Sequence, residues 1–136
     1  LAEAAREEGE RRNRPVEITF HRAFDVAADQ FEALRALIDL GYTRVLTSGG
    51  AATVPQGLGR LRELADFAAG RIQVQAGGGV TPETIGAIRA TGVDAIHLSA
   101  KRTVVSAGGP GGGGDGVRIE LTDRGIVRAA IAAARA

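Results

Sequence analysis

The sequence predicts an α/β protein, a partial (β/α)8 barrel made of about four parallel βα units. Three observations predict it. Short apolar segments alternate with helical segments, and successive strands begin roughly 23 to 28 residues apart. The strands alternate polar and apolar side chains, and each strand ends abruptly in polar residues and glycines. Alternating strands and helices require a parallel sheet with right-handed crossovers.

The predicted elements follow one another regularly along residues 1–136, which we interpret as one partial-barrel domain. In order they are a helix at 1–12, a strand at 16–20, a helix at 29–40, a strand at 44–47, a helix at 55–69, a strand at 72–76, a helix at 81–92, a strand at 95–99 and a closing helix from 122 or 123 to 134.

The boundaries in the first half of the chain have local causes. Pro15 ends the first helix, because proline breaks a helix that it interrupts. Asp29 caps the next helix, with Glu32 three residues later in the pattern of a capping box. Gly41 ends that helix, since glycine is preferred just past a helix C-terminus.

The second half has the same punctuation. The helix at 55–69 has Leu58 and Leu61 at helical spacing, and Gly70 ends it. Thr81 caps the following helix, with Pro82 in its first turn, the preferred place for proline. The glycine-rich segment 107–117 is expected to be a flexible loop, either a lid over the site or a plain linker.

Alternation within the strands favours a barrel over an open doubly wound sheet, whose central strands are apolar on both faces. One set of side chains suits a layer of helices, and the opposite set suits a polar barrel interior. The predicted interior set is Glu17, Thr19, His21, Gln73, Gln75 and His97. A full barrel needs eight strands and about 250 residues. We therefore expect the chain to require a second half-barrel, or another copy of itself, to cover its sheet edges.

Composition restricts the function. A formal net charge of +1 offers no field for nucleic acid, and no apolar run approaches the roughly 20 residues that span a bilayer. We therefore expect no nucleic-acid or membrane partner and a cytoplasmic location. The chain has no cysteine and no methionine, which excludes disulfides, thiolate catalysis and sulfur ligands.

The candidate site lies at the strand ends, because parallel α/β proteins bind ligands at the carboxyl ends of their strands. His21 is the candidate catalytic residue. The candidate ligand-binding residues are Arg22, Asp25, Thr47, Ser48, Gly77, Gly78, Gly79, His97, Ser99 and Lys101.

Each candidate has an alternative role. His21 is an acid/base group, or an interior histidine paired with Glu17, Thr19 or Asp25. Arg22 binds an anionic group through its planar guanidinium, or pairs with Asp25.

The next strands supply hydrogen-bonding groups. Ser48 is expected to hydrogen-bond a ligand, not to act as a nucleophile, since no histidine adjoins it in sequence. Gly77–Gly79 and Ser99–Lys101 fit the two loops that bind phosphate in many barrels. The alternative is that the glycines only make a tight turn, and that His97 is a packed interior residue.

Four segments in order and spacing resemble the CutC family, named for copper homeostasis: residues 20–25, 46–50, 77–80 and 97–101. The resemblance runs from about residue 16 to the final helix. It implies a cytosolic (β/α)8 barrel, of which this chain would be the C-terminal half, and a role linked to copper that includes copper binding.

Two hypotheses follow. In one, the chain is a copper-binding homeostasis protein, as the family name implies; copper is then the expected metal, although Cu(I) prefers sulfur ligands and only two imidazoles are present. In the other, it is an enzyme, or the remnant of one, that binds a small anionic or phosphorylated metabolite at the strand ends. The residues identify neither the substrate nor the metal ligands.

Overall fold

The computed structural model describes residues 2–105 and 118–136. The helices are α1 (Ala2–Arg11), α2 (Gln30–Asp39), α3 (Leu58–Ala68), α4 (Ile85–Arg89) and α5 (Arg124–Arg135), with short 3-10 helices η1 (Arg22–Val26), η2 (Val54–Gln56) and η3 (Pro82–Thr84). The strands are β1 (Thr19–Phe20), β2 (Arg44–Thr47), β3 (Gln73–Gly77), β4 (Ala95–His97), β5 (Lys101–Val105) and β6 (Arg118–Thr122).

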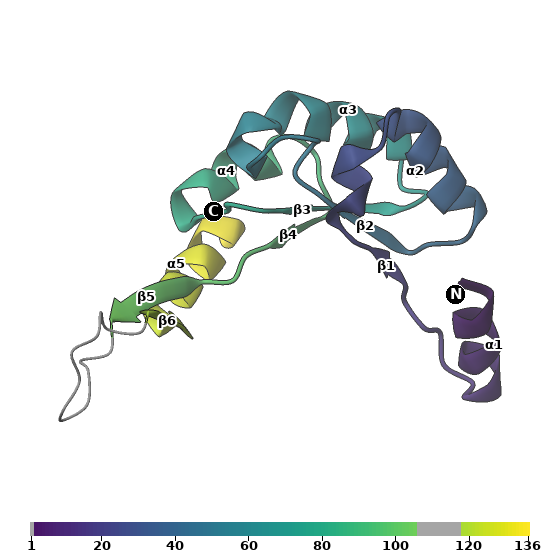
Figure 1. The fold of residues 1–136 in the computed structure, drawn as a ribbon, viewed down its shortest axis with the longest axis horizontal. Helices are drawn as coiled ribbons and strands as arrows, with labels where there is room; N and C mark the ends of the chain where they lie inside the picture. Colours follow the sequence, from purple (N-terminus) through teal and green to yellow (C-terminus); the bar gives the residue numbers. More distant parts are fainter. Residues whose placement is uncertain (1, 106–117) are drawn as a thin grey trace.

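Four parallel strands form the main sheet in the order β1-β2-β3-β4. Helices α2, α3 and α4 arch over one face of it, and α5 follows at the β4 end (Figure 1). The register aligns Val45 with Val74 and Ala76 with Ile96. Strands that take their places in chain order, each crossover carrying a helix, confirm the predicted four βα units of a barrel.

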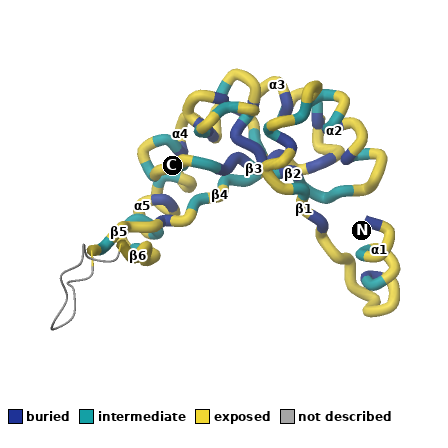
Figure 2. Tube along the Cα trace, viewed as in Figure 1, coloured by how far each residue is buried: buried dark blue, intermediate teal, exposed yellow. Residues whose placement is uncertain are grey.

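The core lies between the sheet and these helices. Val45 and Val74 extend from the sheet, while Leu34, Leu61 and Leu64 meet them from α2 and α3, and all five side chains are fully buried. Figure 2 shows the buried positions concentrated under the helix arch. Burial of the apolar helix faces against the sheet drives this half of the barrel together.

The other face of the sheet is polar, as the alternation predicts, but it is open. Arg44 donates from Nε to Gln73 Oε1 at 2.8 Å and from Nη2 to Glu17 Oε2 at 3.2 Å. Thr19 and His97 are exposed, so the predicted shared interior is a concave surface within the described part of the chain. It is open because only four strands curve around it.

The antiparallel hairpin β5–β6 was not predicted. Its strands carry charged residues and threonine among their valines, isoleucine and leucine, and every position except Val104 is exposed. Lys101–Val105 shows no period-two alternation, and Arg118–Thr122 alternates polar and apolar residues although its apolar positions are exposed. Lys101 begins β5 and does not lie in a strand-to-helix loop as expected. The segment 107–117, expected to be a flexible loop, lies outside the described residues.

One predicted helix also differs from expectation. The segment predicted as one helix at 81–92 is a 3-10 turn, Pro82–Thr84, followed by five α-helical residues. The closing helix starts where predicted, because Asp123 accepts hydrogen bonds from the amides of Gly125 and Ile126. None of the helices described here is long and apolar enough to cross a membrane.

Candidate functional site

The carboxylate of Asp25 organises the edge of the sheet where β1 and β2 end. Thr47 donates from Oγ1 to Asp25 Oδ1 at 2.5 Å, and the amides of Ser48 and Gly50 each donate to Oδ1 at 3.1 Å. Arg22 donates from Nε to Oδ2 at 2.7 Å. Thr47 and Ser48 are fully buried, so their hydrogen-bonding groups serve the protein's own network.

This network changes the acidity of Asp25. Burial acts to raise the pKa of the carboxyl group, but the hydrogen bonds from Thr47, Arg22, Gly50 and Ser48 outweigh it. The net effect lowers the pKa of Asp25 below its ordinary value. Donors that stabilise the charged form produce this direction of shift. Asp25 is therefore a buried anchor carrying a negative charge.

Arg22 is held in place by the same network but keeps part of its guanidinium free. Its Nε binds Asp25, and its Nη2 donates to Ser48 Oγ at 2.7 Å and to the carbonyl of Ala51 at 3.4 Å. Among the described residues, no acceptor is assigned to Nη1. The side chain is 41% exposed. One end of a fixed cation thus offers two N–H groups to a ligand.

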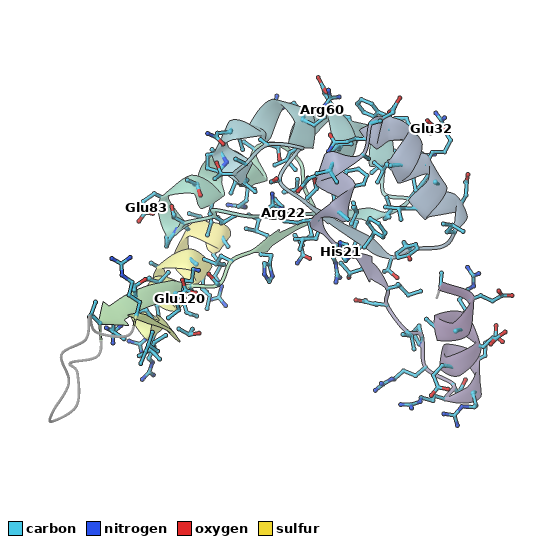
Figure 3. All side chains as sticks on the ribbon, in the orientation of Figure 1. His21, Arg22, Glu32, Arg60, Glu83 and Glu120 are labelled. Carbon is cyan, nitrogen blue, oxygen red and sulfur yellow. The ribbon has the colours of Figure 1, made fainter. Side chains whose placement is uncertain are left out.

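The loop after β3 packs against this free end. Gly78 has φ +121°, and a Cβ added there would lie 2.8 Å from Arg22 Nη1. Glycine is required because L side chains rarely adopt that backbone conformation and because the guanidinium needs the space. The Gly78 carbonyl accepts from the Val54 amide at 2.9 Å, which ties this loop to the one after β2. Figure 3 shows His21 and Arg22 where β1 ends, with Glu83 farther along toward α4.

A cleft of about 900 Å³ extends from Arg22 to α5. It contains seven of the predicted site residues: Arg22, Gly77, Gly78, Gly79, His97, Ser99 and Lys101. Its other lining includes side chains that the sequence analysis did not name as candidate site residues: Leu46, Val80, Thr81, Pro82, Glu83, Leu98, Ala100, Asp123, Ile126 and Ala129. Those from η3 and α5 could not be found by strand-end reasoning, because only the packing of α5 against η3 brings them there.

The two histidines are placed differently. His21 Nδ1 accepts a hydrogen bond from the Ala23 amide at 3.0 Å, and its ring stacks on Phe20 with centroids 5.3 Å apart. His21 therefore caps η1, and it does not line the cleft. His97 does line the cleft, is exposed, and extends from the concave face. Its acid/base use, like that of His21, stays a prediction.

The remaining charged groups of the cleft already have partners. Lys101 pairs with Glu120 at 2.6 Å, and Asp123 pairs with Arg102 at 3.0 Å. A hydrogen bond from Thr81 lowers the pKa of Glu83. Two acidic groups therefore share the cleft with Arg22 and the paired Lys101. The short η3 and α4 segments provide no long helix whose dipole would favour a phosphate, unlike the helix expected from the sequence.

The donor set does not suit copper. Within the described residues, no group of three or more histidine, cysteine or carboxylate side chains is arranged to hold a metal ion. The sequence has neither cysteine nor methionine, the ligands that Cu(I) prefers. His21 has already committed one ring nitrogen to a backbone amide.

Comparisons with a family model and with curated proteins indicate the same family. A model of the CutC family matches residues 5–102. A family protein CutC from Bacteroides fragilis is 45% identical over 90 residues, which are 65% of this chain and 36% of that protein. One from Salmonella newport is 53% identical over 49 residues, 36% of this chain and 20% of that protein. The chain thus spans about a third or less of the length of these curated relatives.

A solved structure supports the same relationship. The putative copper homeostasis protein CutC from Streptococcus agalactiae superposes with a TM-score of 0.57 at 34% identity. The match covers 60% of this chain and 41% of that one. The family match stops at residue 102, just after β5 begins.

Proposed function

We propose that this chain, which belongs to the CutC family, supplies a binding site for a small anionic molecule at the carboxyl ends of its strands. The negative group binds at Arg22, and the rest of the molecule lies in the cleft toward α5. The proposal concerns binding, and any reaction of the ligand would take place in the same cleft.

The observation that supports the proposal best is the state of Arg22. Three hydrogen bonds hold its Nε and Nη2, while Nη1 borders the cleft beside Gly78. A preorganised guanidinium loses little conformational entropy on binding, and its N–H groups match carboxylate and phosphate oxygens.

The backbone of the β3–η3 loop supports the same role. Among the described residues, no acceptor is assigned to the amides of Gly78, Gly79 and Val80. The two glycines have no side chains to cover these N–H groups, so a ligand oxygen at Arg22 can approach them closely. His97 contributes an imidazole that can accept or donate a proton at the same cleft.

The name of the Streptococcus protein refers to copper homeostasis, but copper binding is not the function that these residues support. Two imidazoles on separate strand ends, one of them engaged as a cap, do not make a Cu(I) site. We expect a Cu(I) chelator of micromolar affinity to remove all Cu(I) from the chain, and we expect His21→Ala with His97→Ala to leave that result unchanged. Retention of one equivalent that the double substitution abolishes would establish the copper function instead.

The open concave face of the sheet indicates what kind of partner would cover this chain. We propose that a second half-barrel, in the same polypeptide or a second copy, covers the polar surface around Arg44 and pairs with the edges of β1 and β4. Two parallel edge strands with open backbone groups favour such pairing. Sedimentation equilibrium of the chain tests for the copy, with a dimer as the expected mass; a monomer at all concentrations contradicts self-pairing.

The anion site is tested by titrating the chain with sodium acetate at constant ionic strength. The readout is the NMR shift of the His97 ring and of the amides at Gly78 and Gly79. Arg22→Lys keeps the charge but cannot both bind Asp25 and place a second donor at Gly78, so we expect binding at least about tenfold weaker. Arg89→Lys, at an exposed helix position, is the matched control. Equal affinity in Arg22→Lys, or no saturable shift in the unsubstituted chain, overturns the proposal.

A further inference from the structure

We infer that the ligand of this cleft is an amphipathic monocarboxylate, with one anionic head and an apolar tail of several carbons, and not a phosphorylated metabolite. The inference rests on the proposed anion site at Arg22 and goes further by assigning the chemical class of the ligand. It follows from how charge and apolar surface are divided along the cleft.

The head position holds at most one unit of available positive charge, on Arg22. Arg22 Nη1 is the guanidinium end that its internal hydrogen bonds leave free, while Lys101 is already paired with Glu120 at 2.6 Å. Asp25 lies directly behind Arg22 and partly neutralises it. One carboxylate, with a single negative charge, matches this supply better than a phosphate that carries up to two.

The opposite wall opposes additional negative charge. Glu83 lines the cleft as a carboxylate whose pKa is lowered by a hydrogen bond from Thr81. Asp123 also lines the cleft, at the start of α5, but it is paired with Arg102 at 3.0 Å. A second phosphate, or a dianionic phosphate extending toward α5, would face like charges in a partly enclosed space.

The surface between these charged ends is mainly apolar. Leu46 and His97 approach each other across Gly77, where an added Cβ would lie 2.7 Å from Leu46 Cδ1 and 3.3 Å from His97 Cβ. Leu98 and Ile126 line the same cleft, and both are half-buried.

Helix α5 continues this apolar surface lengthwise. Ile126 and Ala129 are three residues apart and therefore occupy one face of the helix. An alkyl or aryl tail that starts at Arg22 can cover Leu46 and Leu98 and end on Ile126. The volume of about 900 Å³ accommodates a molecule of this size.

The test is a series of probes of increasing tail length: acetate, butanoate, hexanoate and octanoate, titrated into the chain at constant ionic strength. Burial of a whole methylene contributes about 0.8 kcal/mol, so half-burial of each corresponds to about a fourfold gain in affinity for every two methylenes. We expect that gradient to continue to hexanoate at least. Inorganic phosphate is the comparison ligand and is expected to bind more weakly than hexanoate.

Substitutions locate the tail. Ile126→Ala is expected to flatten the gradient for the longer probes and to leave acetate affinity unchanged. Ile131→Ala, on the same helix but outside the cleft lining and 47% exposed, is the matched control and should change neither. A cleft that takes the tail predicts a difference between these two variants, whereas general weakening of α5 predicts none.

The outcomes separate the two proposals. Saturable acetate binding that Arg22→Lys weakens, together with equal affinity for all tail lengths, overturns this inference and leaves the anion site standing. Phosphate binding tighter than hexanoate binding has the same consequence. A gradient that survives Ile126→Ala refutes the assigned tail position. Absence of saturable binding by every probe overturns both proposals.

Discussion

Asp25→Asn tests most directly whether the hydrogen-bond network around Asp25 stabilises the strand ends. The Asp25 side chain is 8% exposed and accepts from Thr47 Oγ1, the amides of Ser48 and Gly50, and Arg22 Nε. Asparagine has nearly the same shape but keeps only one acceptor oxygen, and its new NH2 group faces existing donors. Each buried donor left without a partner costs about 1–3 kcal/mol.

The amide oxygen of the substituted side chain would retain part of this network, so the expected loss is about 2–4 kcal/mol in the free energy of unfolding at pH 7. The midpoint of urea unfolding should fall with no change in its slope. Asp39→Asn is the matched control, because Asp39 is exposed on α2 and has no ion pair or hydrogen bond assigned within residues 2–105 and 118–136. It should change stability by less than about 0.5 kcal/mol.

The pH dependence follows from the lowered pKa of Asp25. A carboxyl group whose pKa is lower in the folded state contributes stability above its unfolded pKa and loses it as pH falls through the folded pKa. The stability gap between the unsubstituted chain and Asp25→Asn should therefore be constant above about pH 5 and should shrink below about pH 4. Taking this difference cancels contributions from other carboxylates, such as Glu83.

Urea melts followed by circular dichroism between pH 3 and pH 7 measure both quantities. A variant within about 0.5 kcal/mol of the unsubstituted chain at pH 7 would refute the argument that Asp25 anchors the strand ends. So would a gap that stays the same down to pH 3, because it would mean that Asp25 is not charged or not stabilised by its donors.

Three further substitutions test other parts of the structure. Gly78→Ala should lower the free energy of unfolding by about 1–3 kcal/mol and weaken acetate binding, since it strains the backbone and displaces Arg22. Gly86→Ala has open space around it and should be neutral or stabilising by up to about 1 kcal/mol. Thermal melts compare the two variants. Leu64→Ala should cost about 2–5 kcal/mol in urea unfolding, because the side chain is fully buried, and a smaller loss would mean that this core is loosely packed. Asp123→Ala should lower stability by about 1 kcal/mol through loss of the α5 cap, and an unchanged melt would contradict that role.

Much of the fold follows from local features of the chain. The start of α2 depends on capping by Asp29, which involves only neighbouring residues, and β2 spans 44–47 as predicted because its apolar pair Val45 and Leu46 lies between Gly41 and the glycines that follow Ser48. The hairpin β5–β6 was not predicted, and its two strands pair only with each other and bury little. Lys101–Val105 has no alternation, and the alternating residues of Arg118–Thr122 do not mark a buried face.

Some of the site could likewise be predicted from the sequence, and some of it depends on burial. Strand-end position correctly suggested that Arg22, Gly78 and His97 come together, since parallel strands release their loops at one edge. The same reasoning included Ser48, whose fully buried side chain serves the Asp25 network, a distinction that depends on burial.

By itself, the sequence determined the alternation of strands and helices, their order, and the edge of the sheet where polar groups gather, because these depend on periodicity and on residues near one another in the chain. Only the tertiary structure decided which part of Arg22 is free, and that Ile126 of α5 faces it across a cleft. The second relationship joins residues about a hundred positions apart, and only the packing of α5 against η3 and α4 brings them to one cleft.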